Sequence, residues 1–206
     1  MTTLKNQVFI CLILFFITDL HAQAGLRLGL NFADFNSGNS LYEYKSKYKT
    51  GIGIGAYYKY NISESLHFQP EILYMQMGWI IKEDDYKEEF HLHYIQFFFP
   101  IQYTFFSSKV INMYLTAGPY AGLAPGKYKI LDCEDFECSS IKQGYSATRD
   151  SGPRFYDFGG IFGGGFSINE HFSVELRFLY GIVNHGYDSE ISMKNKSYFL
   201  SSSYTF

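Results

Sequence analysis

Six charged residues stand at alternating positions inside otherwise apolar stretches, which makes them the first candidates for chemistry. They are Arg27, Lys59, Glu71, Asp157, Glu175 and Arg177. In extended segments, each would lie on the face opposite to a row of bulky apolar side chains. Buried charges are costly unless they are paired and hydrogen-bonded. We therefore expect an interior charge cluster with a structural role, and a proton or ion path is the alternative.

Polar residues near the ends of predicted strands could bind a metal ion or catalyse hydrolysis. His91 and His93 alternate, so they could present two imidazoles on one face, but no third ligand has a fixed spacing. His93, His185, Asp188 and Ser189 are residue types found in hydrolytic sites, yet no nucleophile elbow accompanies them. We therefore predict no metal, no cofactor and no catalytic residue.

Two of the three cysteines, Cys133 and Cys138, lie five residues apart in the motif CEDFEC. The third, Cys11, falls within the predicted export signal described below. An exported pair at this spacing can close a small disulfide loop. A zinc site is not expected, because no histidine lies nearby in the sequence. The spacing alone leaves open whether the two thiols are bonded.

The N-terminal residues resemble a secretory signal. Lys5 precedes a run of ten apolar residues, Val8–Ile17, and small residues follow at Ala22 and Ala24. The run is half as long as the ~20 residues of a membrane-spanning helix. We predict a signal peptide over residues 1–22 and one domain over residues 23–206, although cleavage after Ala24 also fits.

The composition excludes several classes of protein. Aromatic residues make up 20% of the chain and charged residues only 18%, yet the mean hydropathy is −0.11. Apolar and polar residues are therefore finely interleaved, which argues against a helical membrane protein and against a disordered chain. The net charge of −3 and the pI of about 6.1 argue against nucleic-acid binding.

Apolar residues recur with period two through most of the chain, which predicts strands rather than helices. The pattern is clearest where Leu176 and Phe178 alternate with Glu175 and Arg177. Each segment is about as long as a strand that crosses a bilayer. The segments are Gly25–Phe35, Thr50–Asn61, Leu66–Gly78, His91–Phe105, Ile111–Ala124, Tyr156–Ile168, Phe172–Asn184 and Lys196–Phe206.

The connections between these segments alternate in length. Tight turns are expected at 61–65, 107–110 and 169–171, and long polar loops at 36–49, 79–90, 125–152 and 185–195. We predict an all-β fold, an eight-stranded antiparallel up-and-down transmembrane β-barrel with short periplasmic turns and long external loops. The apolar faces, including Leu176 and Phe178, should contact lipid. A soluble sandwich or lipocalin-like barrel, with its apolar face inside, is the alternative.

Five stretches, in order, resemble the PorT-like outer-membrane β-barrel family of Gram-negative bacteria. They are GLRLGLNFADF, FQPEILYMQMGW, HYIQFFFPIQYTF, YLTAGPYAGL and YFLSSSYTF. The chain departs from the family pattern at Arg27 and Gln102, where lysine is common. The resemblance implies an outer-membrane location, lipid contact and partners among envelope or secretion-system proteins, since one member is implicated in type IX secretion.

We therefore expect a non-enzymatic outer-membrane protein that anchors or assembles other envelope components. Fold alone does not define function. Two alternatives remain, an enzyme with a site at the external rim and a small-solute channel. An eight-stranded barrel is just wide enough for side chains to fill it, which disfavours the channel.

Overall fold

The computed structural model describes residues 23–37, 46–83, 86–134, 137–145, 153–169, 171–185 and 192–206. The predicted signal peptide over residues 1–22 lies outside this part of the chain and remains a prediction. No helix within the described residues is long and apolar enough to cross a membrane.

The described chain forms one antiparallel sheet of thirteen strands. The strands, in chain order, are β1 (Gln23–Ser37), β2 (Ser46–Asn61), β3 (Leu66–Phe68), β4 (Glu71–Met77), β5 (Trp79–Glu83), β6 (Tyr86–Phe98), β7 (Ile101–Ser107), β8 (Ile111–Leu123), β9 (Lys127–Glu134), β10 (Glu137–Gly144), β11 (Tyr156–Ile168), β12 (Phe172–Gly181) and β13 (Met193–Thr205).

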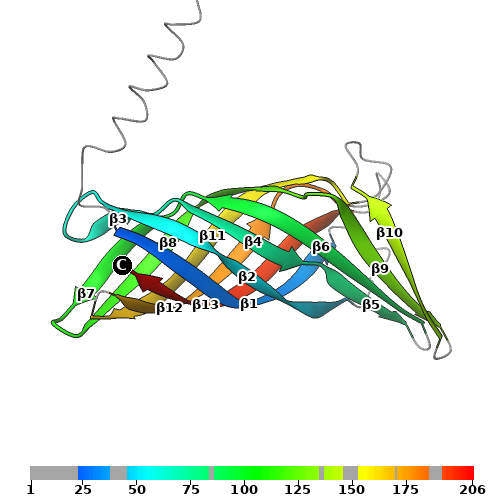
Figure 1. Cartoon of the computed structure of the whole chain (residues 1–206), viewed down its shortest axis with the longest axis horizontal. Helices are drawn as coiled ribbons and strands as arrows, with labels where there is room; N and C mark the ends of the chain where they lie inside the picture. The colour runs from blue at the N-terminus through cyan, green and yellow to red at the C-terminus, as the bar shows by residue number, and fades with distance from the viewer. Residues whose placement is uncertain are drawn as a thin grey trace, which may run out of the picture.

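The sheet closes on itself into a barrel (Figure 1). β1 pairs with both β2 and β13, so that Gly25 lies opposite Tyr57 on one side and Thr205 on the other. In the barrel wall, β3 and β4 together occupy the place of one strand, and β6 and β7 together occupy the place of another. With β1, β2, β8, β11, β12 and β13, these two composite strands make eight barrel strands, which confirms the predicted eight-stranded antiparallel barrel.

A belt of apolar side chains covers the outside of this barrel. Leu26, Leu28 and Leu176 are 56%, 54% and 52% exposed, whereas Arg27 and Arg177 beside them are buried. A soluble barrel would bury its apolar face and expose its polar one. The observed arrangement is that of a barrel surrounded by lipid, with its polar residues in the lumen.

Both described ends of the chain lie at the end of the barrel where the turns are short. The backbone N–H of Phe206 donates to the carbonyl oxygen of Ala24 at 2.9 Å. The tight turn between β11 and β12 places Asn169 at a φ of 49°, a left-handed conformation that asparagine tolerates. Short turns mark the periplasmic end of outer-membrane barrels.

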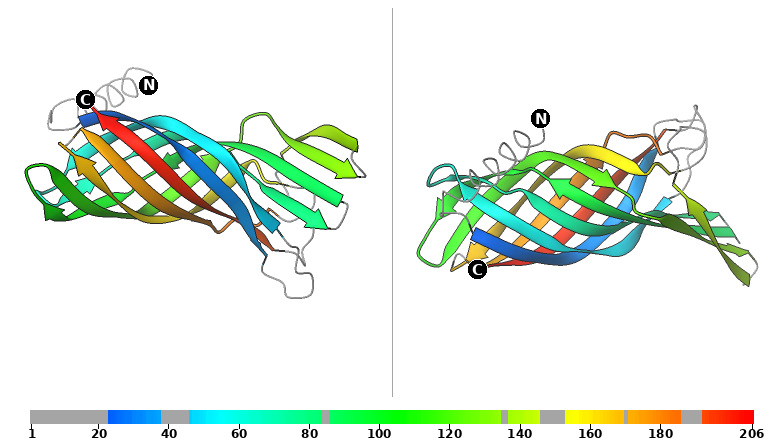
Figure 2. Two further views of the ribbon diagram at one scale, coloured as in Figure 1. Left: turned by 90° about the horizontal axis from the view of Figure 1, so that it is seen from below. Right: turned by 45° about the horizontal axis from the view of Figure 1, so that its top comes forward.

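At the opposite end, the predicted loops 79–90 and 125–152 are largely strands, which corrects the expectation of irregular connections. β5, residues 86–91 of β6, β9 and β10 continue the sheet beyond the barrel (Figures 1 and 2). We call these four segments the external flap. In β6 and β9, the buried residues Phe90, Tyr128 and Ile130 alternate with charged residues and share one face of the flap.

The inner face of the flap has an aromatic core. The rings of Trp79 and Phe90 stack with centroids 4.8 Å apart, and Phe35 of β1 meets Trp79 edge-on at 5.4 Å. Tyr128 and Ile130 of β9 are also buried. Aromatic pairs of this kind add about 0.5–1.5 kcal/mol each to the stabilisation from burial. The flap is therefore packed against the barrel rim as an ordered element.

Candidate functional site

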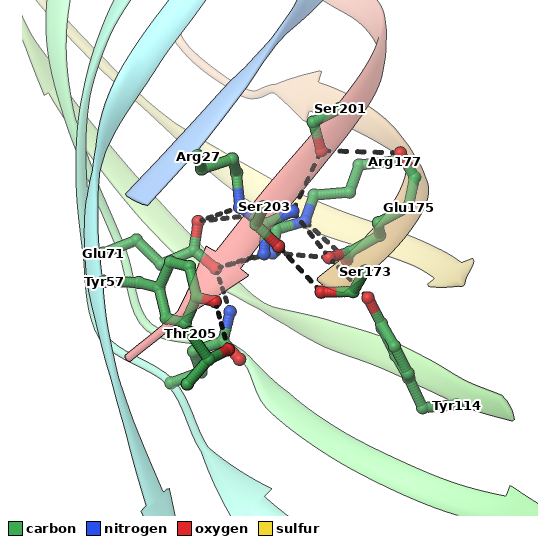
Figure 3. A network of polar contacts seen from close by, with 11 residues as sticks. Arg27, Tyr57, Glu71, Tyr114, Ser173, Glu175, Arg177, Ser201, Ser203 and Thr205 are labelled. Carbon is green, nitrogen blue, oxygen red and sulfur yellow. Dashed lines mark hydrogen bonds and ion pairs between the residues drawn. The ribbon is translucent and has the colours of Figure 1, made fainter. Parts of the chain in front are cut away.

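Four of the six charged residues predicted for the interior meet in the lumen, on three different strands. Arg27 comes from β1, Glu71 from β4, and Glu175 and Arg177 from β12 (Figure 3). Each occupies the inward position of its strand because its two neighbours face lipid. Their side chains are at most 2% exposed.

The four side chains form one hydrogen-bonded network. Arg177 Nη1 and Nη2 donate to Glu71 Oε2 and Oε1 at 2.8 and 2.6 Å, and Arg177 Nε donates to Glu175 Oε1 at 2.6 Å. Arg27 Nη1 donates to Glu175 Oε2 at 2.8 Å, and Arg27 Nε lies 3.3 Å from Glu71 Oε2. Each arginine therefore contacts both carboxylates, and the formal charge of the group is zero.

Neutral side chains satisfy further positions around this network. Gln69 Nε2 donates to Glu71 Oε1 at 2.7 Å, and Arg27 Nη1 donates to Ser201 Oγ at 2.9 Å. The Arg27 and Arg177 guanidinium groups also lie over the rings of Tyr57 and Phe98, at 5.4 and 5.9 Å. Buried ion pairs recover their desolvation cost only when hydrogen bonds saturate them, as they largely do here.

Glycine provides the space for these large side chains on the neighbouring strand. Gly163 of β11 lies directly opposite Arg177 of β12. A Cβ atom at Gly163 would lie 3.0 Å from Arg177 Cα and 3.1 Å from Arg177 Cγ. The backbone carbonyl oxygen of Leu176 would lie closer still, so a side chain at this position would have to displace the β12 backbone that carries Arg177. Glycine therefore allows the close pairing of β11 with β12 beside the network.

The other two predicted members of the cluster, Lys59 and Asp157, lie elsewhere, which corrects the expectation of a single group. Lys59 faces inward one pleat closer to the periplasmic end than Tyr57, and it lines a polar cavity of about 380 Å³ with His67, Glu64 and Tyr114. Asp157 lies six residues along β11 from Gly163, or about 20 Å at ~3.3 Å per residue. The lumen is long enough to hold separate polar layers.

Asp157 belongs to a second buried group near the external end of the lumen. Tyr120 Oη and Asn195 Nδ2 each donate to Asp157 Oδ2 at 2.9 Å. His185 Nε2 lies 3.5 Å from Asp157 Oδ1, and the Arg154 backbone N–H donates to His185 Nδ1 at 3.1 Å. His185 Nε2 thus faces both Asp157 Oδ1 and the side-chain amide nitrogen of Asn195, which lies 3.2 Å away.

Of the four residues considered for a site at the external rim, His185 lies in this buried group and His93 lies apart from it. Asp157 and His185 are 0% and 1% exposed, so solvent does not reach the pair. His93 lies on the outer face of β6, where its Nδ1 contacts Tyr74 Oη at 2.7 Å. Asp188 and Ser189 fall outside the described residues. Within the described part of the chain, no three His, Cys, Asp or Glu side chains come together as metal ligands would.

In the external flap, Cys133 and Cys138 are joined by a disulfide. They lie directly opposite each other on β9 and β10, near the tip of the hairpin. A cross-link between opposite residues prevents the strands from slipping, and a slip of one residue would turn every side chain to the other face. The disulfide therefore keeps each side chain of the hairpin on its own face of the flap.

Several residues of these sites were not identified from the sequence. Tyr120 and Asn195 complete the Asp157 group, and Trp79 and Phe90 form the flap core. Tyr120 and Asn195 carry no local signal, because long-range pairing alone brings them to Asp157. Phe90 could have been found, since Phe90, Leu92 and Tyr94 alternate with Glu89, His91 and His93, whereas Trp79 stands in the run WIIKE, which does not alternate.

Solved structures of outer-membrane proteins are among those that the chain resembles in fold. Ail of Yersinia pestis, in complex with the heparin analogue sucrose octasulfate, matches at 12% identity and a TM-score of 0.46, covering 91% of this chain and 100% of Ail. Neisserial surface protein A matches at 12% identity and a TM-score of 0.48, covering 90% and 99%. The outer membrane enzyme PagL matches at 15% identity and a TM-score of 0.45, covering 85% and 98%.

Comparison with curated protein sequences finds no match. The family model described as "Outer membrane protein beta-barrel domain" matches residues 18–185, which is most of the chain. The inward charges, the lipid-facing apolar belt and the closed antiparallel sheet agree with that match. The protein is thus an outer-membrane β-barrel, and the chain belongs to the outer membrane protein beta-barrel domain family.

Proposed function

We propose that this protein is a non-enzymatic component of the outer membrane that assembles with other envelope proteins through its external flap. The observation that carries the proposal is the neutral network of Arg27, Glu71, Glu175 and Arg177 across the lumen. Because this network fills a narrow barrel with large, mutually bonded side chains, passage of solutes is disfavoured. The ordered feature offered to the outside is then the flap.

The absence of enzymatic activity is part of this proposal. Among the described residues of the lumen, the histidine–aspartate pair of His185 with Asp157 is buried, so a lipid or peptide substrate does not reach it. The order of the flap is the second support, because its aromatic core and its disulfide provide the rigidity that a binding surface needs. The PorT-like resemblance adds the expectation that the partners belong to a secretion system.

Two measurements test the proposal. Planar-bilayer recordings of the folded protein should show no steady ion conductance, and steady conductance altered by Arg177→Ala would identify a channel instead. Affinity purification after cross-linking through Ser139→Cys, an exposed residue of β10 opposite Asp132, should recover a defined envelope protein. A matched variant with the cysteine at the periplasmic turn, Ser108→Cys, should not recover that protein. Recovery by both variants would remove the flap from the proposal.

A further inference from the structure

The outer face of the external flap carries a concentration of positive charge that the assembly proposal does not use. β6 shows which face this is, because Phe90, Leu92 and Tyr94 are buried on the inner side. The alternate residues Lys87, Glu89 and His91 lie on the same side as the lipid-facing Ile95. The outer face of the flap thus continues the lipid-facing surface of the barrel beyond its external end.

Strand register gathers the lysines of neighbouring strands on this outer face. His91 of β6 lies opposite Lys129 of β9, and Lys129 lies opposite Lys142 of β10. Nearer the tip, Lys82 of β5 lies opposite Lys87. At ~4.8 Å between strands, the row His91–Lys129–Lys142 spans about 10 Å. One carboxylate, that of Glu89, shares the face among the flap side chains that the structure describes.

That carboxylate is already occupied. Glu89 Oε1 accepts from Lys49 Nζ at 2.6 Å, and Glu89 Oε2 accepts from Lys87 Nζ at 3.1 Å. Within the described flap, Lys129 and Lys142 therefore oppose each other across the strands with no carboxylate beside them on this face. Like charges directly opposite each other destabilise a sheet. An anion bound from outside would relieve this repulsion.

Apart from Glu89, the acidic side chains that the structure describes in the flap lie on its inner side. Glu88 and Asp132 are opposite each other, and both alternate with the outer-face residues. The flap is thus basic outside and acidic or apolar inside, and the Cys133–Cys138 disulfide preserves this separation by holding β9 and β10 in register.

We propose that the outer face of the flap binds the phosphate groups of lipids in the outer leaflet. The lysines of β9 and β10 lie beyond Ile95 and Leu123, the last apolar residues exposed on this side of β6 and β8, so they would meet the headgroup region of neighbouring lipids. Basic residues near an anionic membrane surface contribute about 1 kcal/mol each, which is about fivefold in affinity. This lipid contact is separate from the protein assembly proposed above.

The test compares two lipid probes with the detergent-solubilised full barrel: diphosphoryl lipid A and the same lipid after removal of its phosphates. We expect the phosphorylated lipid to bind more tightly, by native mass spectrometry or fluorescence titration. Lys129→Gln and Lys142→Gln should each weaken its binding about fivefold, and the double variant more than either. The control Lys109→Gln removes one charge at the periplasmic turn and should leave binding unchanged.

Three outcomes would overturn the proposal. One is equal binding of the two lipids, and another is a loss in Lys109→Gln equal to that in Lys129→Gln. The third is tighter binding of a soluble sulfated polysaccharide than of diphosphoryl lipid A, which would make a soluble polyanion the ligand. Heat-modifiable migration on gels verifies that every variant is a folded barrel.

Discussion

Arg177 and Glu71, 106 residues apart in the chain, form a bidentate ion pair inside the barrel. Both Nη atoms of the guanidinium donate to the two carboxylate oxygens, at 2.8 and 2.6 Å. The pair joins β12 to β4 across the lumen, and both side chains are at most 1% exposed. With this geometry, the network links strands on opposite sides of the barrel and also fills the lumen between them.

Replacing Arg177 with methionine should therefore destabilise the barrel strongly. The change leaves Glu71 and Glu175 buried with only Arg27 to offset them, and breaking a buried pair costs about 3–5 kcal/mol. Guanidinium unfolding in lipid vesicles, followed by heat-modifiable gel migration, measures this loss. Adding Glu71→Gln should restore part of the stability, because it removes the stranded charge. A single variant as stable as the wild type would show that water already screens these groups.

The lipid-facing belt predicts a dependence on depth within one strand. Leu176 lies near the middle of β12 and is 52% exposed on the outer face. Leu176→Arg should reduce the free energy of unfolding by about 2–4 kcal/mol, as arginine does at the bilayer midplane. Phe172→Arg, at the periplasmic end of the same strand, is the matched control and should cost only about 0–1 kcal/mol. Equal costs at the two positions would contradict the assigned depth.

Breaking the Cys133–Cys138 disulfide should loosen the flap without unfolding the barrel. The loop that it closes is short, so the chain-entropy contribution is about 2 kcal/mol. The double variant Cys133→Ser and Cys138→Ser should become sensitive to trypsin at Lys129 and Lys142, because these residues lie in the strands that the disulfide joins. Heat-modifiable migration of the remaining barrel serves as the control. Global unfolding in this variant would mean that the barrel depends on the flap.

The flap should also lose stability in acid. Burial, together with the charge of Lys49, lowers the pKa of His91 below its usual value of 6.5. Burial alone would raise the pKa of Glu89, but the bonds from Lys49 and Lys87 outweigh it and lower that pKa below 4.5. In both cases the unfolded flap binds more protons. The stabilisation is therefore complete above the unfolded pKa values and is lost as the pH falls through the folded ones.

Hydrogen exchange of β6 and β9 amides, corrected for the intrinsic rate at each pH, measures this effect. Protection should fall as the pH drops below 6.5 because of His91, and further below pH 4.5 because of Glu89. His91→Gln should remove part of the first decrease, while amides of β12 serve as an internal control in the barrel. Protection that rises in acid would contradict the assigned signs.

The barrel itself follows from local properties of the sequence. Period-two alternation identifies each barrel strand, and it decides which residues can share a face of the sheet. Arg27, Glu71, Glu175 and Arg177 are therefore assigned to the interior by the pattern of their neighbours. The alternation of long and short connections then predicts the antiparallel order. Residues close together in the chain are sufficient to establish all of these features.

Which interior residues meet is a property of the folded barrel. Alternation places a residue on a face but says nothing about its height along the lumen, which depends on the register between strands. Register placed Asp157 with Tyr120, Asn195 and His185, about 20 Å along β11 from the position opposite Arg177. It likewise brought the lysines of four flap strands together on one face. Such groupings arise from hydrogen-bonded pairing between distant segments, so the closed sheet alone could reveal them.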